Sequence, residues 1–295
     1  MFKSCEICGA DKWDLVVYEG AVRSGSFGTC TEGGRILRCG GCGADRLDEK
    51  VSIASASYDN DEYRIAMDQG MEVEDFFNHA DPTQIHNLSA FWPLDLRDKV
   101  IADIGCGAGS FLSHVSGLAK NIVAIEPTER YHTSLRQCGY DVFSYATDAL
   151  KIHPEGVDVG VTFQVIEHVQ NPRLFLAEIA SLLKPGGALV IGTPNRDDIL
   201  LKLLPEEFPQ FYYRTAHRWY FDRASLRQCV ELAGLQVESE RYLQTYGMSN
   251  ALLWMKERRP HGFARLPGIN HVADQLWNGY LEATGQANNL IISVS

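Results

Sequence analysis

The 295-residue sequence lacks any apolar run that approaches the roughly 20 residues of a membrane-spanning helix. Its first residues, Met-Phe-Lys-Ser-Cys, contain no apolar core of a secretory signal. Internal repeats, low-complexity segments and obvious flexible linkers are also missing. These absences argue against membrane-embedded, secreted, repetitive and disordered classes, so the sequence predicts a globular protein of the cytoplasm.

Positive charge is in deficit as well. The 27 Lys and Arg residues face 38 Asp and Glu residues, which gives a formal net charge of -11 and a pI near 5.3. Because nucleic-acid-binding domains usually carry a broad basic surface, this balance argues against a nucleic-acid partner. Apolar residues make up 45% of the chain, and its length suits one α/β domain of about 200 residues with a small additional domain.

The cysteines show one clear pattern. Cys5 and Cys8 form one Cys-x-x-Cys pair, Cys39 and Cys42 form a second, and each pair is followed by glycine. Two such pairs supply four thiolates, the ligand set of a closed structural Zn²⁺ site. The 30 residues between the pairs exceed the roughly 15 to 20 of the compact pattern, so we expect a zinc ribbon with a longer loop over residues 1–46. The alternative is four unrelated cysteines.

A glycine-rich turn dominates the middle of the sequence. A short β-branched run leads to Asp103, glycines follow at positions 105, 107 and 109, and a helical pattern begins at Phe111. Glycines at such a turn let the backbone bend sharply and let a ligand lie against it. The Gly-x-Gly-x-Gly spacing differs from the Gly-x-Gly-x-x-Gly of dinucleotide sites, so a pyrophosphate is not the expected ligand.

The segment Asp-Ile-Gly-Cys-Gly-Ala-Gly-Ser-Phe resembles the first motif of the S-adenosylmethionine-dependent methyltransferases that have the doubly wound α/β fold. The resemblance implies that Gly105, Gly107 and Gly109 face the methionine part of S-adenosylmethionine. It covers the chain from about Tyr58 onward and implies a small-molecule methyltransferase.

Two acidic residues extend this pattern. Glu126 ends a second buried strand 21 residues after Gly105, the distance at which one strand-helix-strand unit places a carboxylate beside a ribose. A surface glutamate at a strand end is the alternative. Asp148, followed by Ala149, resembles the loop with which the family reads adenine, and a helix N-cap is the rival role for Asp148.

Apolar runs and helical patterns alternate along the rest of the chain. Strands are predicted over residues 100–104, 121–127, 142–144, 157–163, 188–195, 235–242 and 289–294. This order predicts a doubly wound, seven-stranded, mostly parallel sheet, and the resembled fold implies that the seventh strand runs antiparallel between the fifth and the sixth. We assign residues 47–98 to a helical lid and residues 99–295 to the methyltransferase core, with substrate insertions at 195–222 and 246–285.

Two tyrosines in the lid, Tyr58 and Tyr63, belong to a Tyr-rich segment that resembles one folding over the cofactor in many small-molecule methyltransferases. Their aromatic faces suit a sulfonium cation. Packing of a helix onto the sheet is the alternative, and the residues alone leave both open.

Two histidines are candidates for acid-base chemistry. His168 lies in a Glu-His-Val segment after the fourth strand, similar to that of ubiquinone-type methyltransferases, where it either contacts substrate or orders the loop. His217 lies in the aromatic insertion and is the candidate general base, since its unperturbed pKa is near neutrality. A histidine bonded to a loop carbonyl is the alternative for His217.

The predicted function is transfer of a methyl group from S-adenosylmethionine to a carbon, oxygen or nitrogen atom of a small polar metabolite. A zinc ribbon before such a core is similar to the C-methyltransferases of nucleotide-linked sugars, although their further carboxyl-terminal domain has no counterpart here. The alternatives are an RNA or protein methyltransferase with the ribbon as docking module, and a non-catalytic protein that recruits a partner. The predicted cofactor-binding residues are Tyr58, Tyr63, Asp103, Gly105, Gly107, Gly109, Glu126, Pro127, Asp148, Ala149 and Gln164.

Overall fold

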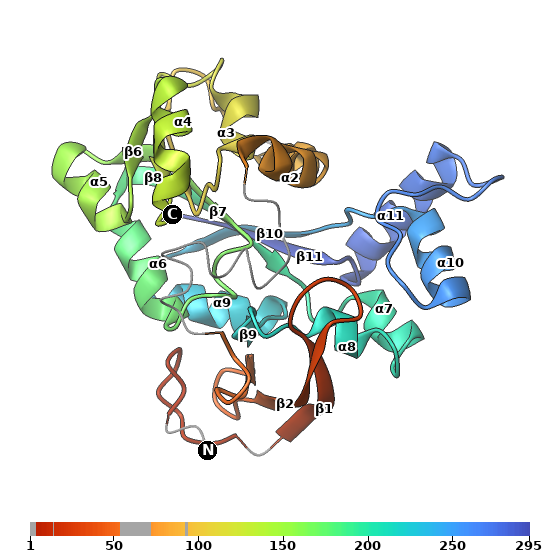
Figure 1. The fold of residues 1–295 in the computed structure, drawn as a ribbon. Helices are drawn as coiled ribbons and strands as arrows, with labels where there is room; N and C mark the ends of the chain where they lie inside the picture. Colours follow the sequence, from red (N-terminus) through yellow and green to blue (C-terminus); the bar gives the residue numbers. More distant parts are fainter. Residues whose placement is uncertain (1–3, 14, 54–71, 92–93) are drawn as a thin grey trace.

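The computed structural model describes residues 4–13, 15–53, 72–91 and 94–295. Tyr58 and Tyr63 therefore lie outside the described residues. A seven-stranded sheet with the order β10-β11-β8-β7-β4-β5-β6 forms the centre of the molecule (Figure 1). Its strands are β4 (Val100–Ile104), β5 (Asn121–Ile125), β6 (Asp141–Phe143), β7 (Val157–Phe163), β8 (Leu183–Pro194), β10 (Val237–Leu243) and β11 (Asn289–Val294).

The direction of the strands agrees with the predicted fold class. Strands β4 to β8 pair in parallel. Strand β11 lies between β8 and β10 and runs antiparallel to both, as the resemblance implied. The doubly wound, seven-stranded, mostly parallel sheet is confirmed.

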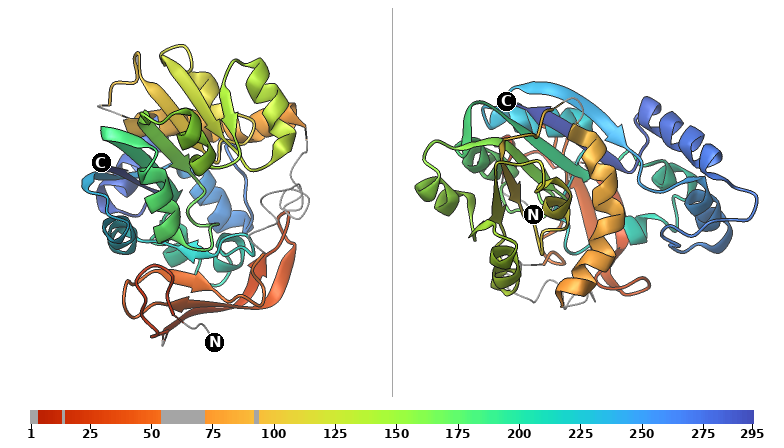
Figure 2. Two further views of the ribbon diagram at one scale, coloured as in Figure 1. Left: turned by 90° about the vertical axis from the view of Figure 1, so that its left-hand side faces the viewer. Right: turned by 90° about the horizontal axis from the view of Figure 1, so that it is seen from above.

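Helices cover both faces of this sheet (Figures 1 and 2). Consecutive side chains of a strand point to opposite faces, so Val123 and Ile125 pack into one core while Ile122 and Ala124 pack into the other. The first core includes α5 (Ala146–Ile152), α6 (Pro172–Ala180) and α9 (Arg223–Leu232). The second includes α2 (Val73–Asn87), η2 (Leu88–Phe91), α3 (Ser110–Val115), η3 (Glu129–Tyr131) and α4 (His132–Gln137).

The fifth parallel strand begins earlier than the sequence predicts. Helix α6 ends at Ala180, and β8 starts at Leu183, five residues before the predicted 188. Leu183 pairs with Val157, and the register of β7 and β8 then shifts before Val159 pairs with Ala188. The Lys-Pro-Gly-Gly turn is therefore an irregularity within β8, because β8 pairs with β7 both before and after it.

A second sheet joins the N-terminal segment to the core. It has the order β1-β2-β3-β9, with β1 (Leu15–Arg23), β2 (Cys30–Arg38), β3 (Asp45–Leu47) and β9 (Trp219–Tyr220). All three pairings are antiparallel. Strand β9 comes from the insertion at 195–222, so the N-terminal sheet is completed by a strand from the core (Figure 1).

A third hydrophobic core forms where these regions meet. It combines β1 and β2 with α7 (Ile199–Leu203), α8 (Pro209–Tyr212) and α10 (Met248–Glu257). Helices α10 and α11 (His271–Thr284) form an arm that extends from the rest of the molecule (Figures 1 and 2). Many aromatic residues of the insertion are thus core residues: Phe208, Tyr212, Tyr213 and Tyr220.

No helix among the described residues is long and apolar enough to cross a membrane.

Candidate functional site

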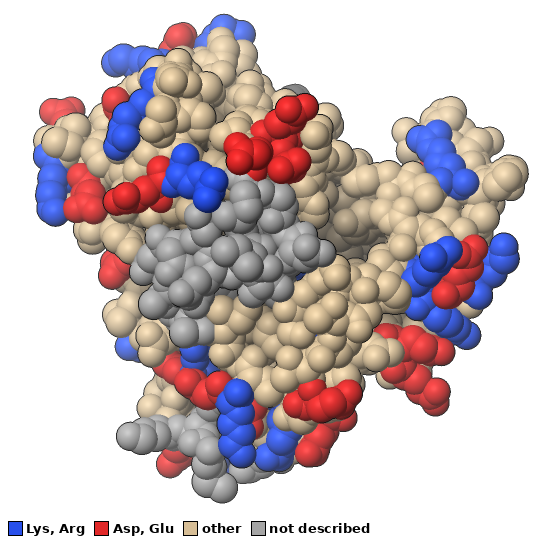
Figure 3. Space-filling view, viewed as in Figure 1, with Lys and Arg blue, Asp and Glu red and all other residues tan. Residues whose placement is uncertain are grey.

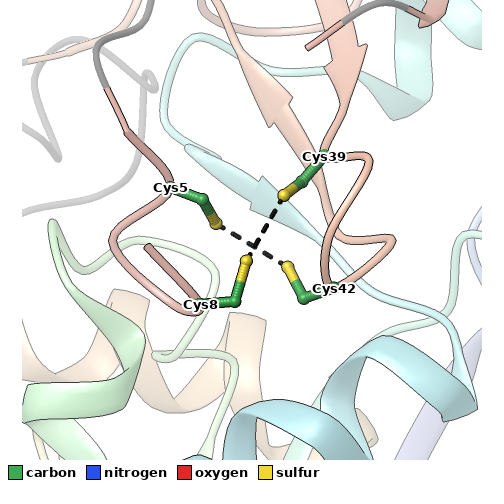
Figure 4. Close-up of side chains that lie close together, drawn as sticks. All are labelled: Cys5, Cys8, Cys39 and Cys42. Atoms are coloured by element: carbon green, nitrogen blue, oxygen red, sulfur yellow. Dashed lines mark hydrogen bonds between the residues drawn. The ribbon is translucent and has the colours of Figure 1, made fainter. Parts of the chain in front are cut away.

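The four predicted metal ligands converge in the N-terminal segment (Figure 4). The Sγ atoms of Cys5 and Cys42 are 3.7 Å apart, and those of Cys8 and Cys39 are 3.6 Å apart. Zn–S bonds of about 2.3 Å in a tetrahedron place sulfur atoms about 3.8 Å from one another. The backbone N–H of Gly41 also donates to Cys39 Sγ at 3.4 Å. The donor set and its spacing therefore fit a structural zinc ion.

A buried ion-pair network fixes the ribbon to the core. The Asp45 side chain, 1% exposed, accepts two hydrogen bonds from the Arg38 guanidinium at 2.7 and 3.0 Å. Arg196, from the start of the insertion at 195–222, donates to the same carboxylate at 3.0 Å and also to Asp222 and the carbonyl of Gly43. A buried carboxylate is stable only when its charged partners are present. Because Arg38 belongs to the ribbon and Arg196 to the insertion, the stability of each region depends on the other.

The glycine turn connects β4 to α3 with left-handed backbone at each glycine. The φ angles of Gly105, Gly107 and Gly109 are 81°, 57° and 90°. A Cβ on Gly105 would collide with the Val165 side chain, and one on Gly107 would collide with the Phe76 ring. The turn thus requires glycine for its conformation and for close packing.

Glu126 organises this turn from the neighbouring strand. Its Oε2 accepts from the backbone N–H of Gly107 at 2.8 Å, and its Oε1 accepts from that of Thr128 at 2.9 Å. The residue is only 8% exposed, so the alternative of a surface glutamate is wrong. Each carboxylate oxygen can accept more than one hydrogen bond, and Glu126 can still accept from the two hydroxyls of a ribose. Pro127 follows directly and is partly buried.

Asp103 is the last residue but one of β4, next to the turn, and is 4% exposed. Burial, with a further contribution from the nearby Glu126, raises the pKa of Asp103 to about 8. The carboxyl group is therefore largely protonated at neutral pH. A cationic ligand at the turn would favour its ionised form.

This pKa predicts a pH-dependent stability. Between its ordinary pKa of 3.8 and about 8, Asp103 binds a proton in the folded chain but not in the unfolded chain. The contribution of Asp103 to the free energy of unfolding therefore falls as pH rises from 4 to 8. As pH rises from 5 to 9, we expect the free energy of unfolding of Asp103→Asn to increase by at least about 2 kcal/mol relative to that of the wild type, since one pKa unit corresponds to about 1.4 kcal/mol. Urea denaturation at both pH values measures this, with the exposed Asp11→Asn as control; an equal pH dependence in Asp103→Asn and wild type would contradict it.

Asp148 and Ala149 are not in a loop. Both belong to the first turn of α5, and this part of the prediction is wrong. The N-cap residue is Tyr145, so the N-cap role for Asp148 is also wrong. Asp148 instead accepts a hydrogen bond from Lys151 at 2.7 Å, three residues along the helix, and Ala149 is fully buried. A contact of Asp148 with adenine stays a prediction.

A cavity of about 350 Å³ opens beyond the carboxyl ends of β7 and β8. Both predicted substrate insertions, at 195–222 and 246–285, contribute to its lining, together with α2 from the lid. The surface is hollowed between the α10–α11 arm and the rest of the molecule (Figure 3). Aromatic side chains form one wall, namely Phe208, Phe211, Tyr212, Trp254 and Trp277.

Both candidate histidines line this cavity. The Nδ1 of His168 lies 2.8 Å from the carbonyl oxygen of Ala216. Since a carbonyl only accepts, Nδ1 carries the proton and the Nε2 of a neutral ring carries the lone pair. The expected loop-ordering bond of His168 is therefore present. The rings of His168 and His217 meet edge to face with centroids 4.7 Å apart.

His217 is 5% exposed, and its Nδ1 makes no hydrogen bond to any residue that the structure describes, so the alternative of a bond from this nitrogen to a loop carbonyl is not observed among those residues. Burial lowers the pKa of His168 to about 4 and that of His217 well below its ordinary value. Both imidazoles are therefore neutral at neutral pH.

Gln164 faces the same cavity. It has a left-handed backbone with φ of 58°, and its Nε2 donates to Asn289 Oδ1 at 3.1 Å. Asn289 in turn donates to Thr245 Oγ1 at 2.9 Å, which ties β7 to the ends of β10 and β11. The structure therefore places Gln164 beside the two histidines, and its role toward the cofactor stays a prediction.

Three further residues at these sites were not selected from the sequence. Phe76 lies against Gly107. Glu167, 1% exposed, lies beside His168 and carries a pKa raised by burial to about 7. Arg214 also lines the cavity. Of these three, only Glu167 could have been selected from the sequence, because it directly precedes His168. The contacts of Phe76 and Arg214 join segments that are distant in the sequence.

The sequence model of the methyltransferase domain family matches residues 76–240, which is more than half of the chain. The chain belongs to the methyltransferase domain family. The match begins in α2 and ends within β10, so it includes the glycine turn, Glu126 and both cavity histidines. The N-terminal segment with the four cysteines lies outside it.

Individual methyltransferases are similar over parts of the chain. Ubiquinone biosynthesis O-methyltransferase of Parvibaculum lavamentivorans is 34% identical over 120 residues, which cover 37% of this chain and 47% of that protein. The enzyme of the same name from Thiobacillus denitrificans is 28% identical over 164 residues, covering 48% of this chain and 67% of that protein. The chain thus spans between about half and two thirds of these relatives.

Two solved structures share the fold. One is a chain of the Haloferax volcanii complex between the Trm112 methyltransferase activator and a methyltransferase, with a TM-score of 0.52 and 14% identity; the match covers 74% of this chain and 92% of that one. The other is an S-adenosylmethionine-dependent methyltransferase of Thermotoga maritima, with a TM-score of 0.50 and 21% identity, covering 75% and 93%. These structures confirm the predicted Rossmann-like fold, while the membership of the methyltransferase domain family rests on the match over residues 76–240.

Proposed function

We propose that this chain transfers a methyl group from S-adenosylmethionine to a small polar molecule bound in the cavity beyond β7 and β8. The observation that carries the proposal is the buried Glu126 carboxylate, held by the amides of Gly107 and Thr128 at the carboxyl edge of the sheet. Open α/β sheets bind their ligands at this edge. Membership of the methyltransferase domain family supports the same conclusion.

The residues of the turn would hold the cofactor by shape and hydrogen bonding. Glu126 accepts from the ribose hydroxyls with its remaining lone pairs, and Gly105 and Gly107 let the ligand approach the backbone. When bound, S-adenosylmethionine supplies an electrophilic methyl group. The aromatic wall of the cavity orients the acceptor and shields it from water, which is the main contribution required of a protein in an in-line displacement.

The neutral histidines would receive the acceptor's proton where the acceptor carries one. His217 lines the cavity with an Nδ1 that has no hydrogen-bond partner among the described residues, and His168 is fixed in one tautomer by Ala216. A positioned base of this kind contributes about 100- to 10,000-fold to the rate.

A nucleotide-linked sugar is a finer proposal for the acceptor. It is supported by the ribbon ahead of the core and by Arg214 beside the ring of Phe211, a pairing of cation and aromatic face that suits a phosphorylated ligand with a ring system. The comparisons name ubiquinone biosynthesis O-methyltransferases, which supports methylation of a small molecule in general.

The alternative functions have less support. The ribbon completes its sheet with β9 and packs into the core, which leaves less of it to act as a separate docking module. Lys and Arg are interspersed with Asp and Glu on the face seen in Figure 3, an arrangement that does not favour RNA. A non-catalytic protein that only recruits a partner would not require the buried Glu126 carboxylate at the glycine turn.

The test is to incubate the protein with isotopically labelled S-adenosylmethionine and an extract of its source cells, and to trace the label by mass spectrometry. We expect label in a small molecule, and label in a sugar nucleotide would support the finer proposal. Label only in RNA or protein would contradict the small-molecule acceptor. Absence of binding of S-adenosylhomocysteine by calorimetry would contradict the function altogether.

Replacement of the cavity histidine tests its role directly. We expect His217→Ala to reduce the labelled product at least 100-fold while leaving the affinity for S-adenosylhomocysteine within about twofold, because His217 faces the acceptor and not the glycine turn. The matched control is His153→Ala, which removes an imidazole outside the cavity. Unchanged product formation in His217→Ala would exclude a role in the reaction.

A further inference from the structure

One carboxylate and two imidazoles come together where β7 ends. Glu167, His168 and His217 each offer one ligand-type atom, and these atoms all lie within 4.8 Å of one another. Glu167 Oε1 is 3.9 Å from His168 Nε2. His217 reaches this position from the insertion at 195–222, so the group exists only in the folded chain. His168 and His217 line the acceptor cavity, and the buried Glu167 lies beside His168.

Two buried atoms of this group have no hydrogen-bond partner in the part of the chain that the structure describes. Glu167 Oε1 belongs to a residue that is 1% exposed, and His217 Nδ1 belongs to one that is 5% exposed. Polar atoms removed from water without a partner are rare in folded proteins, because their desolvation is not compensated. A carboxylate oxygen and an imidazole nitrogen in this condition, next to a third potential ligand, point to a cation.

The surroundings of the group orient its ligand atoms. Thr193 Oγ1 donates to Glu167 Oε2 at 3.0 Å, which leaves Oε1 directed to the histidines. His168 donates from Nδ1 to the carbonyl of Ala216, which places its lone pair on Nε2. Metal-binding histidines and carboxylates are typically held by such outer hydrogen bonds, which fix the tautomer and the ring.

We propose that Glu167, His168 and His217 bind one divalent transition-metal cation, and that an oxygen atom of the methyl acceptor completes its coordination. Two imidazoles and one carboxylate suit Mn²⁺, Fe²⁺, Co²⁺ or Zn²⁺. Metal–ligand bonds of about 2.1 Å place ligand atoms roughly 3 to 3.5 Å apart, so the side chains close by about 1 Å on binding. Three protein ligands leave coordination positions open toward the cavity.

The cation indicates which class of acceptor the cavity binds. This part of the inference rests on the proposed function. An acceptor with a hydroxyl group binds through its oxygen, and the cation stabilises the deprotonated oxygen. The two histidines then hold the cation in place of accepting the proton, which leaves to solvent. A molecule with two adjacent oxygen atoms, which can occupy two open positions, fits best. The structural zinc of the ribbon is a separate site, since its four thiolates form a closed set.

The experiment titrates Mn²⁺ into the full chain with the ribbon zinc in place and follows the paramagnetic resonance signal of free Mn²⁺. Mn²⁺ is chosen because thiolates bind it poorly. We expect one bound equivalent for the wild type and for the control His153→Ala, and at least tenfold weaker binding for His217→Ala and Glu167→Gln. Binding of S-adenosylhomocysteine by each variant shows that it is folded. In the wild type, electron spin-echo modulation from imidazole nitrogen identifies the ligands without any substitution.

Several outcomes overturn the proposal. One is the lack of a stoichiometric Mn²⁺ site in the wild type. The others are an affinity of both variants for Mn²⁺ equal to that of the wild type, and bound Mn²⁺ without modulation from imidazole nitrogen. If the yield of labelled product does not depend on added Mn²⁺, the proposal that the acceptor coordinates the cation is wrong. Failure of the wild type to bind S-adenosylhomocysteine would instead contradict the proposed function, and the Mn²⁺ titration would still decide the cation site.

Discussion

Glu126→Gln is expected to weaken binding of S-adenosylhomocysteine at least 100-fold. The carboxylate accepts from the amides of Gly107 and Thr128 and, in the proposed complex, from two ribose hydroxyls. A glutamine has one accepting oxygen, so its amide group would face an N–H donor at the turn. Hydrogen bonds to a charged partner contribute about 1.5 to 3 kcal/mol each, and the loss of two accounts for the expected change.

Calorimetry with S-adenosylhomocysteine measures this effect, and circular dichroism shows whether the sheet is retained. The control is Glu129→Gln, which removes an exposed carboxylate three residues along the chain. An affinity for S-adenosylhomocysteine within threefold of the wild type in Glu126→Gln would refute the assignment of Glu126 to the ribose. Loss of affinity in both variants would point to net charge as the cause.

Loss of the ribbon metal is expected to destabilise the acceptor side of the molecule as well as the ribbon. We expect Cys39→Ser to lose one equivalent of zinc and to lower the melting temperature by at least about 10 °C, since structural zinc contributes about 10 to 16 kcal/mol to the folding of isolated zinc-binding peptides. Cys39 and Cys42 lie in the same core cluster as Trp219 and Phe221, which follow His217 in the chain. Product formation should therefore fall together with stability.

Metal analysis, thermal unfolding and the labelling assay test this prediction, with the exposed Cys30→Ser as control. A free-standing docking module would behave differently: Cys39→Ser would then lose zinc while the core kept its melting temperature and its binding of S-adenosylhomocysteine. Zinc content equal to that of Cys30→Ser would contradict the four-cysteine site itself.

Several features of the site could be predicted because their signals are local. The strand, glycine turn and helix at Gly105 to Gly109 lie within one short segment, and the two Cys-x-x-Cys pairs each supply half of the ligand set expected for a structural zinc ion. Glu126 follows one strand-helix-strand unit after the turn, so its place at the sheet edge is determined by the connection. The succession of the seven strands followed from the alternation of apolar runs and helical patterns, whereas the antiparallel place of the last strand in the sheet came from the resemblance.

Other features depended on contacts between distant segments. Asp148 was predicted in a loop, but α5 begins at Ala146, because the buried Ala149 packs this turn against the sheet. The pairing of β3 with β9 joins residues 45–46 to residues 219–220, and no short-range pattern indicates it. Phe76 resembled any core phenylalanine until the fold placed it on Gly107.

The sequence alone therefore determined the fold class, the ribbon's cysteines and the acid beside the glycine turn, since each is encoded by spacing within a strand-helix unit or a turn. The tertiary structure decided which side chains share the acceptor cavity. It brings His217 to His168 and Glu167, and it packs the ribbon against the insertion that carries His217. The physical reason is that these contacts are made by side-chain packing and strand pairing across loops of many residues, whose closure depends on the whole fold.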